Sequence, residues 1–455
     1  MTAAARISPQ ETSRRSLGQQ FIIFLLPLLL GNVLQALSNT INGIFLGRML
    51  GASAIASTAG VFPVLMFFTS FVIGLGTGAS ILVGRAWGAK DLTKAQEIAG
   101  AALVGGISLG LVAALVGIVS VDTWLQWMHT PPEIRQAATA YARIAVLAFP
   151  AVFVFMLISA VLRGTGDTRT PLISLAIACA ALIALTPTLI GGALGIPRLG
   201  VEGAALASAC ATLLSLAWLM RHLAKRRSPF ALGSIAPHLR FNRAILSEIV
   251  RLGVPTGLFF VTGSLADMML LSLVNSYGTA ATAAWGAVNQ VMAYVQMPAM
   301  CIAIAASVFA AQAIGAKEFV RVKQITNTGI WMNLALTGGV ATMVAIFSSS
   351  AVRLFVVEPE VVQLAGSLLH ITVWGSVLFG IASVFSAVMR AAGTVLIPTT
   401  ISLACLAVLL VPLASLFNGF FGIHGLWIAY PATYGCALLL QALYFYRIWR
   451  RVPTV

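Results

Sequence analysis

Long apolar stretches recur along the chain, and short polar segments separate them. A helix that crosses the hydrocarbon core of a bilayer needs roughly 20 apolar residues. Twelve stretches reach this length, at about 20–46, 53–83, 98–121, 139–162, 171–194, 200–221, 248–275, 279–312, 325–348, 366–390, 397–420 and 424–447. The pattern therefore predicts an all-α, multi-pass membrane protein with 12 transmembrane helices.

Several of these stretches contain a proline, among them Pro27, Pro150 and Pro412. Inside a helical bundle, neighbouring helices can satisfy the carbonyl groups that a proline leaves without a partner. We expect these prolines to act either as fixed kinks for packing or as hinges.

The composition agrees with a lipid environment. Of the 455 residues, 59% are hydrophobic and only 9% are charged, whereas roughly a quarter of the residues of a soluble protein are charged. The apolar run that begins at Phe21 is not followed by a small-residue cleavage site, so we expect it to remain as the first helix. The five cysteines lie in apolar stretches without metal-ligand spacing, which predicts buried, small hydrophobic side chains.

The basic residues indicate an orientation. With the N-terminus in the cytoplasm, 22 of the 27 Lys and Arg fall on the cytoplasmic side and five on the outer side. Positively charged loops remain in the cytoplasm, so we expect a cell (inner) membrane protein with both termini cytoplasmic. The net charge of +15 is thus a topology signal and not a sign of nucleic-acid binding. The most basic loop, 221–251, is expected to tether two halves and to contact membrane lipid.

An internal repeat divides the chain. The sequence Gly-Ala-Lys-Asp at 88–91 recurs as Gly-Ala-Lys-Glu at 315–318, a shift of 227 residues. The same shift relates Gly51 to Gly278, Arg163 to Arg390, Gly166 to Gly393 and Pro171 to Pro398. We therefore expect two pseudo-symmetric six-helix bundles, and transport folds place the substrate path between such repeats. The predicted divisions are a cytoplasmic N-terminal segment (1–19), an N-lobe (20–221), a cytoplasmic linker (222–247), a C-lobe (248–447) and a cytoplasmic tail (448–455).

Several motifs resemble those of the multidrug and toxic compound extrusion (MATE) family. The fragment Leu-Arg-Gly-Thr-Gly-Asp-Thr-Arg-Thr-Pro at 162–171 is similar to the family's segment between helices 4 and 5, and a weaker copy occupies 389–394. The runs 39–48 and 200–208 also fit the family pattern. The resemblance covers essentially the whole chain. It implies export of organic, often cationic, compounds in exchange for H⁺ or Na⁺.

The chain departs from the family pattern at two positions. Proton-linked relatives carry an aspartate near the end of the helix 1 motif, where this chain has Asn42. A second aspartate usually precedes the proline of helix 5, where Thr186 precedes Pro187. Because neither Asn nor Thr titrates near neutral pH, the resemblance implies that the usual N-lobe proton site is absent.

One carboxylate lies well inside a predicted helix. Eleven of the 12 acidic residues fall in loops or at helix ends, and Asp267 is the exception. A charge at the bilayer centre costs at least about 2.5–3.5 kcal/mol, so an acid there is either a functional group or a protonated, hydrogen-bonded packing residue. Neighbouring positions on helices 7 and 8 predict the rest of a substrate or ion site, at Ser264, Asn289, Gln290 and Tyr294.

Helix 1 carries a polar stripe. Gln35, Ser38, Asn39 and Asn42 follow i, i+3, i+4, i+7 spacing and therefore share one face. Such a face is unfavourable against lipid, so it either makes interhelical hydrogen bonds or lines a cavity. We count Gln35, Asn39 and Asn42 among the candidate binding residues.

These observations predict a secondary active efflux transporter of small organic, cationic compounds, driven by an H⁺ or Na⁺ gradient and working by alternating access. We expect no cofactor, no metal apart from the alternative of Na⁺ at Asp267, and a monomer in membrane lipid. The alternatives are an exporter of a specific metabolite and a lipid-linked flippase, but we expect no buried Lys or Arg in the spanning segments to hold a pyrophosphate. A membrane enzyme would need clustered His, Asp or Cys, and the repeat gives no reason for a channel.

Overall fold

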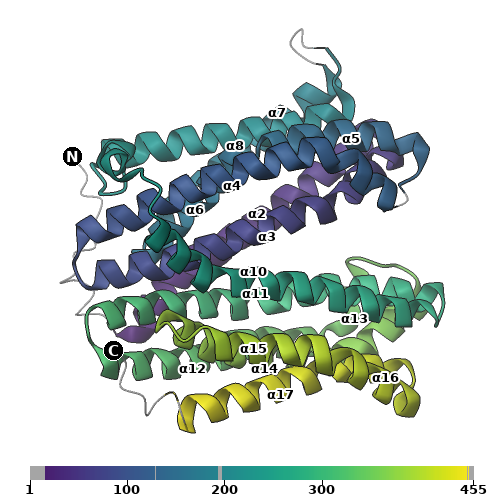
Figure 1. Ribbon diagram of the computed structural model, residues 1–455. Coiled ribbons are helices and arrows are strands. Elements are labelled where there is room, and N and C mark those ends of the chain that lie inside the picture. Colours follow the sequence, from purple (N-terminus) through teal and green to yellow (C-terminus); the bar gives the residue numbers. More distant parts are fainter. Residues whose placement is uncertain (1–15, 129, 193–196, 448, 450–455) are drawn as a thin grey trace. The chain divides into compact units, whose positions relative to one another are not determined.

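The computed structural model describes residues 16–128, 130–192, 197–447 and 449. Within these ranges the chain is helical and contains no strand, as the apolar pattern predicts. The long helices of the first half are α2 (Leu17–Leu50), α3 (Ala52–Gly88), α4 (Leu92–Trp127), α5 (Pro132–Leu147), α6 (Phe149–Gly164), α7 (Arg169–Gly191) and α8 (Gly200–Lys225). Figure 1 labels them along the chain.

The second half repeats this arrangement. A short segment formed by α9 (Leu232–Ile235) and the 3₁₀ turn η1 (Ala236–His238) precedes it. The helices that follow are α10 (Arg243–Asn275), α11 (Thr279–Gly315), α12 (Phe319–Ile346), α13 (Ser348–Arg353), α14 (Pro359–Ala391), α15 (Leu396–Ala404), the π turn η2 (Cys405–Leu409), α16 (Leu410–Phe421) and α17 (Ile423–Arg447).

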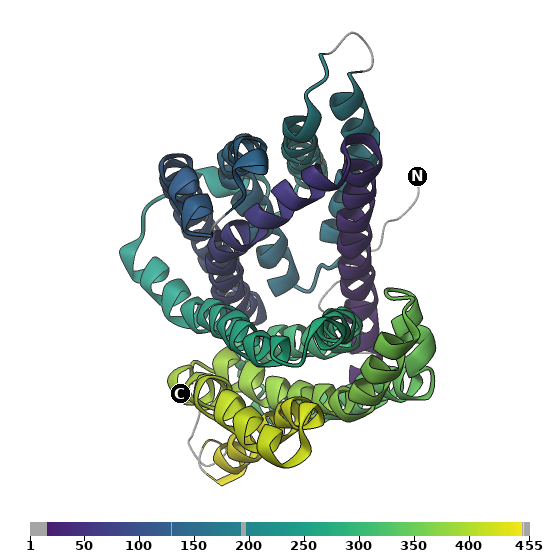
Figure 2. The same ribbon diagram turned by 90° about the vertical axis from the view of Figure 1, so that its right-hand side faces the viewer.

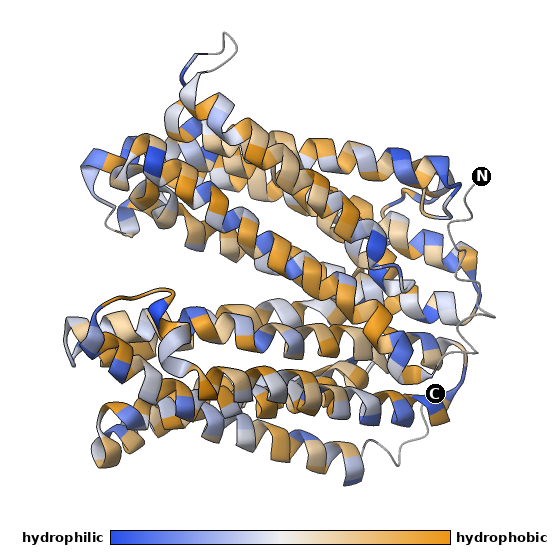
Figure 3. Cartoon of the chain, turned by 180° about the vertical axis from the view of Figure 1, so that it is seen from behind, coloured by the Kyte–Doolittle hydropathy of each residue, from blue (hydrophilic) through white to orange (hydrophobic). Residues whose placement is uncertain are grey.

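Eleven helical spans in the described residues are long and apolar enough to cross a membrane. The twelfth predicted span is the pair α5 and α6, which is bent by 48°. Pro150 stands at the start of α6 and has no N–H for the preceding turn, so this proline causes the bend. Figure 3 shows apolar residues along the middle of the helices and hydrophilic residues gathered at their ends and turns.

The predicted eleventh span is interrupted in its middle. Residues Cys405–Leu409 form a π turn between α15 and α16, and Pro412 follows it in α16. A π turn accommodates one extra residue in a helix, and a proline nearby removes an N–H from the regular ladder. The sequence predicts either a kink or a hinge at this proline, and the structure has a π turn just before it.

The backbone confirms the internal repeat. Helices α3 and α11 are both 37 residues long, and their first residues differ by the same 227 positions as the sequence motifs. Left-handed backbone conformations recur in pairs, at Lys90 and Lys317 with φ of 59° and 60°, and at Gly166 and Gly393 with φ of 94° and 92°. Lysine rarely adopts positive φ, so its recurrence at one offset shows that the two turns share a fold.

The chain forms two compact units whose boundaries fall inside helices. One, which we call the N-terminal unit, comprises Leu30–Leu258, and the other, the C-terminal unit, comprises Met1–Leu29 and Phe259–Val455. The boundaries thus divide α2 and α10, whereas the sequence places the lobe boundaries between helices. Figures 1 and 2 show the helices of each unit running alongside one another.

The start of α2 is buried in the C-terminal unit. Phe21 and Phe24 pack their rings 4.9 and 5.3 Å from the ring of Phe309 in α11. The Arg321 guanidinium donates a hydrogen bond of 3.0 Å to Oε1 of Gln20. These contacts explain why residues before Leu30 cluster with the second half of the chain.

The start of α10 packs against α3 in the N-terminal unit, and glycines make this approach close. A Cβ on Gly74 would lie 2.7 Å from the carbonyl oxygen of Gly253. A Cβ on Gly253 would collide with the backbone of Gly74, and one on Gly78 with the backbone of Ile249. Small residues let helix backbones approach within a membrane protein, so the glycines position this part of α10.

Candidate functional site

Asp267 lies on α10 and receives a hydrogen bond from another helix. The Tyr430 hydroxyl of α17 donates to Oδ1 of Asp267 at 2.8 Å. The other carboxylate oxygen makes no hydrogen bond within the described part of the chain, and the Asp267 side chain is exposed. One oxygen is therefore fixed by the protein and the other is open to a ligand.

Aromatic side chains surround Tyr430 within the C-terminal unit. The Tyr430 ring lies 6.3 Å from Trp285 of α11 and 6.3 Å from Tyr434. Trp285 makes an edge contact with the buried Trp427, and Tyr434 contacts Phe379 of α14. Aromatic pairs at these distances restrict ring rotation, so they hold the Tyr430 hydroxyl in place.

The sequence missed Tyr430 as a site residue. It stands 163 residues from Asp267, and helix 12 contains no acidic residue that would mark a site there. The signal in the sequence is the spacing of Tyr430 and Tyr434, which share one helix face. That spacing predicts a helix face with two tyrosine hydroxyls. It does not show which other helix this face contacts.

The α11 helix presents an exposed face of small and polar residues. Its members follow i, i+4, i+7, i+11, i+14 spacing and are all exposed: Thr279, Ala283, Gly286, Gln290 and Ala293. We call this set the α11 stripe. By contrast, the exposed face of α12 carries Trp331, Met343 and Ile346, each at least 64% exposed. Large apolar side chains suit lipid, whereas exposed amides suit water.

The other predicted site residues of the C-terminal unit do not contact Asp267. Ser264 is exposed and donates to the carbonyl oxygen of Phe260 at 3.1 Å. Asn289, Gln290 and Tyr294 are exposed on or beside the α11 stripe and make no hydrogen bond within the described residues. The structure thus joins Asp267 to Tyr430 and leaves these four as separate groups.

The predicted polar stripe on α2 divides into two kinds of contact in the N-terminal unit. Gln35 donates through Nε2 to Oδ1 of Asn39 at 3.5 Å, and both are exposed. The buried Ser38 hydroxyl contacts the thiol of Cys179 on α7. The stripe therefore makes interhelical contacts on one side and remains exposed on the other.

Asn42 and Thr186 meet across α2 and α7. The Thr186 hydroxyl donates to Oδ1 of Asn42 at 3.5 Å, and Thr186 is fully buried. These are the two positions where the resemblance expects acids. Their contact shows that the two positions are adjacent in the fold. In this chain both side chains are neutral.

One expectation about charge is wrong. We expected no buried Lys or Arg in the spanning stretches, yet Arg390 lies in the last turn of α14 with its Nε buried. Its Nη1 donates to Ser386 Oγ at 2.7 Å, and no carboxylate in the described residues lies within 4 Å. The sequence pattern locates this residue at a helix end but does not show which side chains cover it.

The turn after Arg390 also differs from its repeat partner. In the N-terminal unit, Oδ1 of Asp167 accepts from the backbone of Arg169 and Thr170, which caps the start of α7. The corresponding residue is Thr394, whose hydroxyl accepts from the Trp449 indole at 3.0 Å. The two turns share a backbone conformation but differ in charge.

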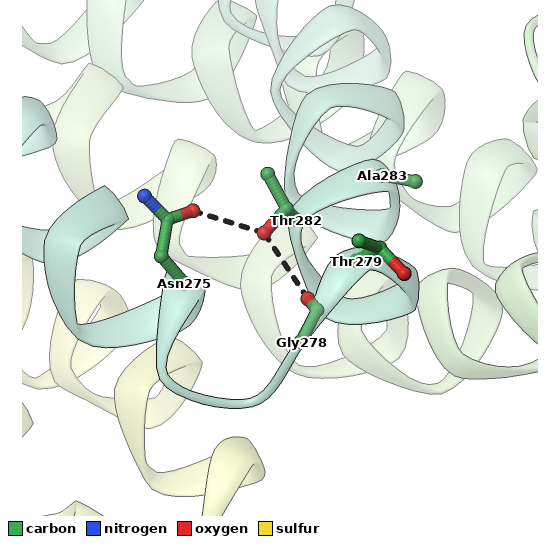
Figure 4. A pocket seen from close by; sticks show the side chains of 5 residues that line it. All are labelled: Asn275, Gly278, Thr279, Thr282 and Ala283. Carbon is green, nitrogen blue, oxygen red and sulfur yellow. Dashed lines mark hydrogen bonds between the residues drawn. The ribbon is translucent and has the colours of Figure 1, made fainter.

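A pocket of about 440 Å³ lies at the turn between α10 and α11. Figure 4 shows its lining residues, Asn275, Gly278, Thr279, Thr282 and Ala283. The Thr282 hydroxyl donates to Asn275 Oδ1 at 2.9 Å, which closes the turn. Thr279 and Ala283 belong to the α11 stripe, so the stripe begins at this pocket. Among the described residues, no three His, Cys, Asp or Glu gather as metal ligands.

Comparison with known proteins decides the family. A family model described as MatE matches residues 27–188 and 255–416, one match in each half. The chain belongs to the MatE family. One match lies in each copy of the repeat, and each match ends before the last helix of its half, α8 or α17.

Relatives and solved structures agree with this membership. The chain is 39% identical to the probable multidrug resistance protein YoeA of Bacillus subtilis, over 99% of this chain and 98% of the relative. It is 25% identical to a FAD transporter of Shewanella oneidensis, over 92% of each chain. A crystal structure of a mutant of the MATE transporter VcmN of Vibrio cholerae matches with a TM-score of 0.88 and 22% identity, covering 97% of this chain and 99% of that one.

Membership confirms several sequence predictions. The chain is a multi-pass membrane transporter of the MATE type with a two-lobed helical fold, and it is not an enzyme. Relatives of the chain are named for multidrug resistance and multidrug export.

Proposed function

We propose that this transporter exports small organic cations in exchange for H⁺, with Asp267 as the group that holds the proton and the cation in turn. The proposal rests on the exposed carboxylate of Asp267, which lies on a candidate membrane-spanning helix and has one oxygen fixed by a hydrogen bond from Tyr430. A carboxylate that accepts a charge-assisted hydrogen bond has a defined orientation. Its second oxygen can then pair with a cationic substrate.

The energetic argument for exchange rests on charge. Asp267 is neutral with a proton bound, and it forms a neutral pair with a monovalent organic cation. The empty, ionised carboxylate is the least favourable of the three states, because an unpaired charge in a membrane-spanning segment is costly. The protein therefore changes conformation mainly when one of the two ligands is bound, which couples their movements.

The α11 stripe provides a surface along which the substrate can move. Its exposed small and polar residues extend from the turn pocket at Thr279 to Gln290, with Asn289 and Tyr294 beside it. A water-containing surface of this kind admits a hydrated cation, whereas a lipid-facing one does not. We propose that Gln290, Asn289 and Tyr294 contact the substrate in the C-terminal unit, with the exposed Ser264 as an additional polar contact. In the N-terminal unit, Gln35, Asn39 and Asn42 remain the proposed polar binding residues.

Protons are favoured over Na⁺ by the contacts of Asp267. The described residues supply one hydroxyl hydrogen bond to this carboxylate, whereas a sodium ion is held by several oxygen atoms. We further propose that the protein works as a monomer in the cell membrane with both termini in the cytoplasm, a proposal supported by the 22-to-5 distribution of basic residues.

The test compares the wild-type protein with Asp267→Asn in proteoliposomes that contain a pH-sensitive dye. Addition of a cationic substrate, such as ethidium, should release protons from the wild type but not from the variant. Glu360→Gln is the matched control, because Glu360 lies exposed in the first turn of α14 in the same unit. Proton-coupled transport that survives unchanged in Asp267→Asn would refute the proposal, and ethidium transport that requires Na⁺ and releases no protons would identify the other ion.

A metabolite exporter is the second candidate. It is supported by the relative named as a FAD transporter, which shares 25% of its residues with this chain. Arg390 gives the lipid-linked flippase one buried cation that the sequence did not predict, but that cation stands at a helix end. Competition of flavins or of lipid-linked pyrophosphates with ethidium export distinguishes these candidates, because a drug exporter keeps its rate in their presence.

A further inference from the structure

The segment 221–251, which runs from the end of α8 through the linker to the start of α10, carries an unbalanced positive charge. Its basic residues are Arg221, Lys225, Arg226, Arg227, Arg240, Arg243 and Arg251. The chain contains no acidic residue between Glu202 and Glu248. Other basic turns contain acidic residues, since Asp91 follows Lys90 and Glu318 follows Lys317. The linker therefore differs from the other turns in charge, and not only in length.

The linker is folded onto the N-terminal unit. Phe230 and Ile235 are 4% and 3% exposed, and the Phe230 ring lies 6.1 Å from Trp87 at the end of α3. Nε2 of Gln96 in α4 donates to the carbonyl oxygen of Pro229 at 2.9 Å. Figure 1 shows the segment crossing from the end of α8 to the start of α10. Its inner side is thus fixed, so its outer side presents a defined surface.

The outer side combines exposed apolar side chains with free positive charges. Leu232 is 53% exposed and Phe241 is 70% exposed. Arg240 and Arg243 flank Phe241 and are also exposed. Among the described residues, none of the linker's seven basic side chains lies within 4 Å of a carboxylate. We call the set Lys225, Arg226, Leu232, Arg240, Phe241 and Arg243 the linker surface.

The linker surface lies at the ends of two candidate membrane spans. It follows α8 and precedes α10, and both helices are candidate membrane spans. Basic residues next to a membrane span are attracted by anionic lipid, with about 1 kcal/mol for each Lys or Arg. An exposed aromatic side chain in such a segment inserts at the boundary between headgroups and acyl chains. The positive charges and the exposed apolar side chains thus both indicate an anionic lipid as the ligand.

We propose that the linker surface is a binding site for the headgroups of anionic phospholipids. The arginines and Lys225 contact the phosphate, and Phe241 inserts beside the acyl chains. The surface takes lipid and not a soluble phosphate, because a soluble anion would not explain the exposed Phe241 and Leu232. This inference does not depend on Asp267 or on the exported substrate.

The experiment measures lipids retained by the purified, full-length protein in native mass spectrometry. Phosphatidylglycerol and phosphatidylcholine are added at equal concentration. The wild type should retain phosphatidylglycerol preferentially. The variant K225Q/R226Q/R240Q/R243Q should lose this preference, with about a fivefold loss of affinity for each cation removed. High salt should weaken the same preference, because it screens exposed charges.

A matched variant removes four basic residues elsewhere. K94Q/R169Q/K323Q/R447Q changes the net charge equally at exposed positions, and it should keep the lipid preference. Phe241→Ser should weaken retention of phosphatidylglycerol while all charges remain. Thermal unfolding of each variant in detergent shows whether it is folded.

Three results would overturn the proposal. They are equal loss of lipid in the linker variant and in the matched variant, unchanged retention in the folded linker variant, and displacement of phosphatidylglycerol by inorganic phosphate at equal concentration. The last result would show that the surface binds a free anion.

Discussion

At the scale of residues, each unit contains a pair of side chains that form a hydrogen bond between two helices, and the two pairs differ in chemistry. In the C-terminal unit, Tyr430 donates to the Asp267 carboxylate at 2.8 Å. In the N-terminal unit, Thr186 donates to the Asn42 amide oxygen at 3.5 Å. A hydrogen bond to a charged group contributes about 1.5–3 kcal/mol, and one between neutral groups about half as much. Only the first pair contains a group that titrates, which supports the proposal that the two units have unequal roles.

Removal of the Tyr430 hydroxyl should weaken transport without unfolding the protein. Tyr430→Phe keeps the ring contacts with Trp285 and Tyr434 but removes the bond that orients Asp267. We expect about a tenfold lower rate of ethidium-driven proton release, because one charge-assisted hydrogen bond is lost. Tyr446→Phe, at an exposed position near the end of α17, is the control and should keep the wild-type rate. An equal rate in both variants would show that the hydroxyl does not act in exchange.

A carboxylate restored at position 42 should create a second titrating group. In Asn42→Asp, the Thr186 hydroxyl lies where it can donate to the new oxygen. We expect substrate-induced proton release to reappear in part when Asn42→Asp is combined with Asp267→Asn. The measurement is proton release per substrate in proteoliposomes. If the double variant released no protons, the N-terminal pair would be unable to take part in coupling.

At the scale of elements, α10 links a packing contact to the candidate site. Its first half is held against α3 through Gly74 and Gly253, and its second half carries Asp267. A side chain at either glycine would push the backbones apart, and interior overpacking costs about 1–3 kcal/mol. The same helix thus carries a close packing contact in its first half and the candidate site in its second half.

Gly253→Ala should destabilise the protein by about 1–3 kcal/mol, because the added Cβ would meet the backbone of Gly74. Thermal unfolding in detergent measures the loss as a lower midpoint. Gly338→Ala in α12 is the control, since a Cβ there has no atom within 4 Å, and it should be neutral or slightly stabilising. If Gly253→Ala unfolded at the wild-type temperature, the close approach of α3 and α10 would be refuted.

The helices themselves were largely predictable, but their interruptions were not. Twelve apolar stretches gave twelve spans, because lipid requires each crossing to be continuously apolar. The 48° bend at α5 and α6 and the π turn at Cys405–Leu409 depend on local hydrogen bonding. A proline in the sequence shows that an N–H is missing, but it does not show whether the helix bends or widens there.

At the scale of the whole molecule, the repeat was visible in the sequence because turns need particular residues. Paired residues such as Gly166 and Gly393 have the same backbone conformation. A single shift of 227 residues therefore aligns the two halves of the sequence. The site was less predictable. Asp267 stood out because charge is rare in the membrane, whereas Tyr430 is an ordinary aromatic residue until α17 is placed beside α10. Burial of Arg390 was missed for the same reason, since burial depends on neighbours distant in sequence.

Reporter fusions test the proposed orientation of the whole chain. Green fluorescent protein fused after Val455 or inserted in the linker at Gly233 should fluoresce, because it folds in the cytoplasm. Alkaline phosphatase fused after Pro131, between α4 and α5, should be active, because it needs the outer side. These results follow from the distribution of basic residues. The opposite set of signals would reverse the topology.

The division of α2 between the two units has a consequence for biosynthesis. Gln20 leaves the ribosome 301 residues before its partner Arg321. At roughly 5–20 residues per second, this interval lasts about 15–60 seconds. The N-terminal unit is fully synthesised once residue 258 has been added, whereas the start of the first helix must wait in the bilayer without its final neighbours. For most of this interval Phe21 and Phe24 lack the ring of Phe309 that they contact in the folded protein. Assembly of the C-terminal unit therefore joins segments that are synthesised far apart in time.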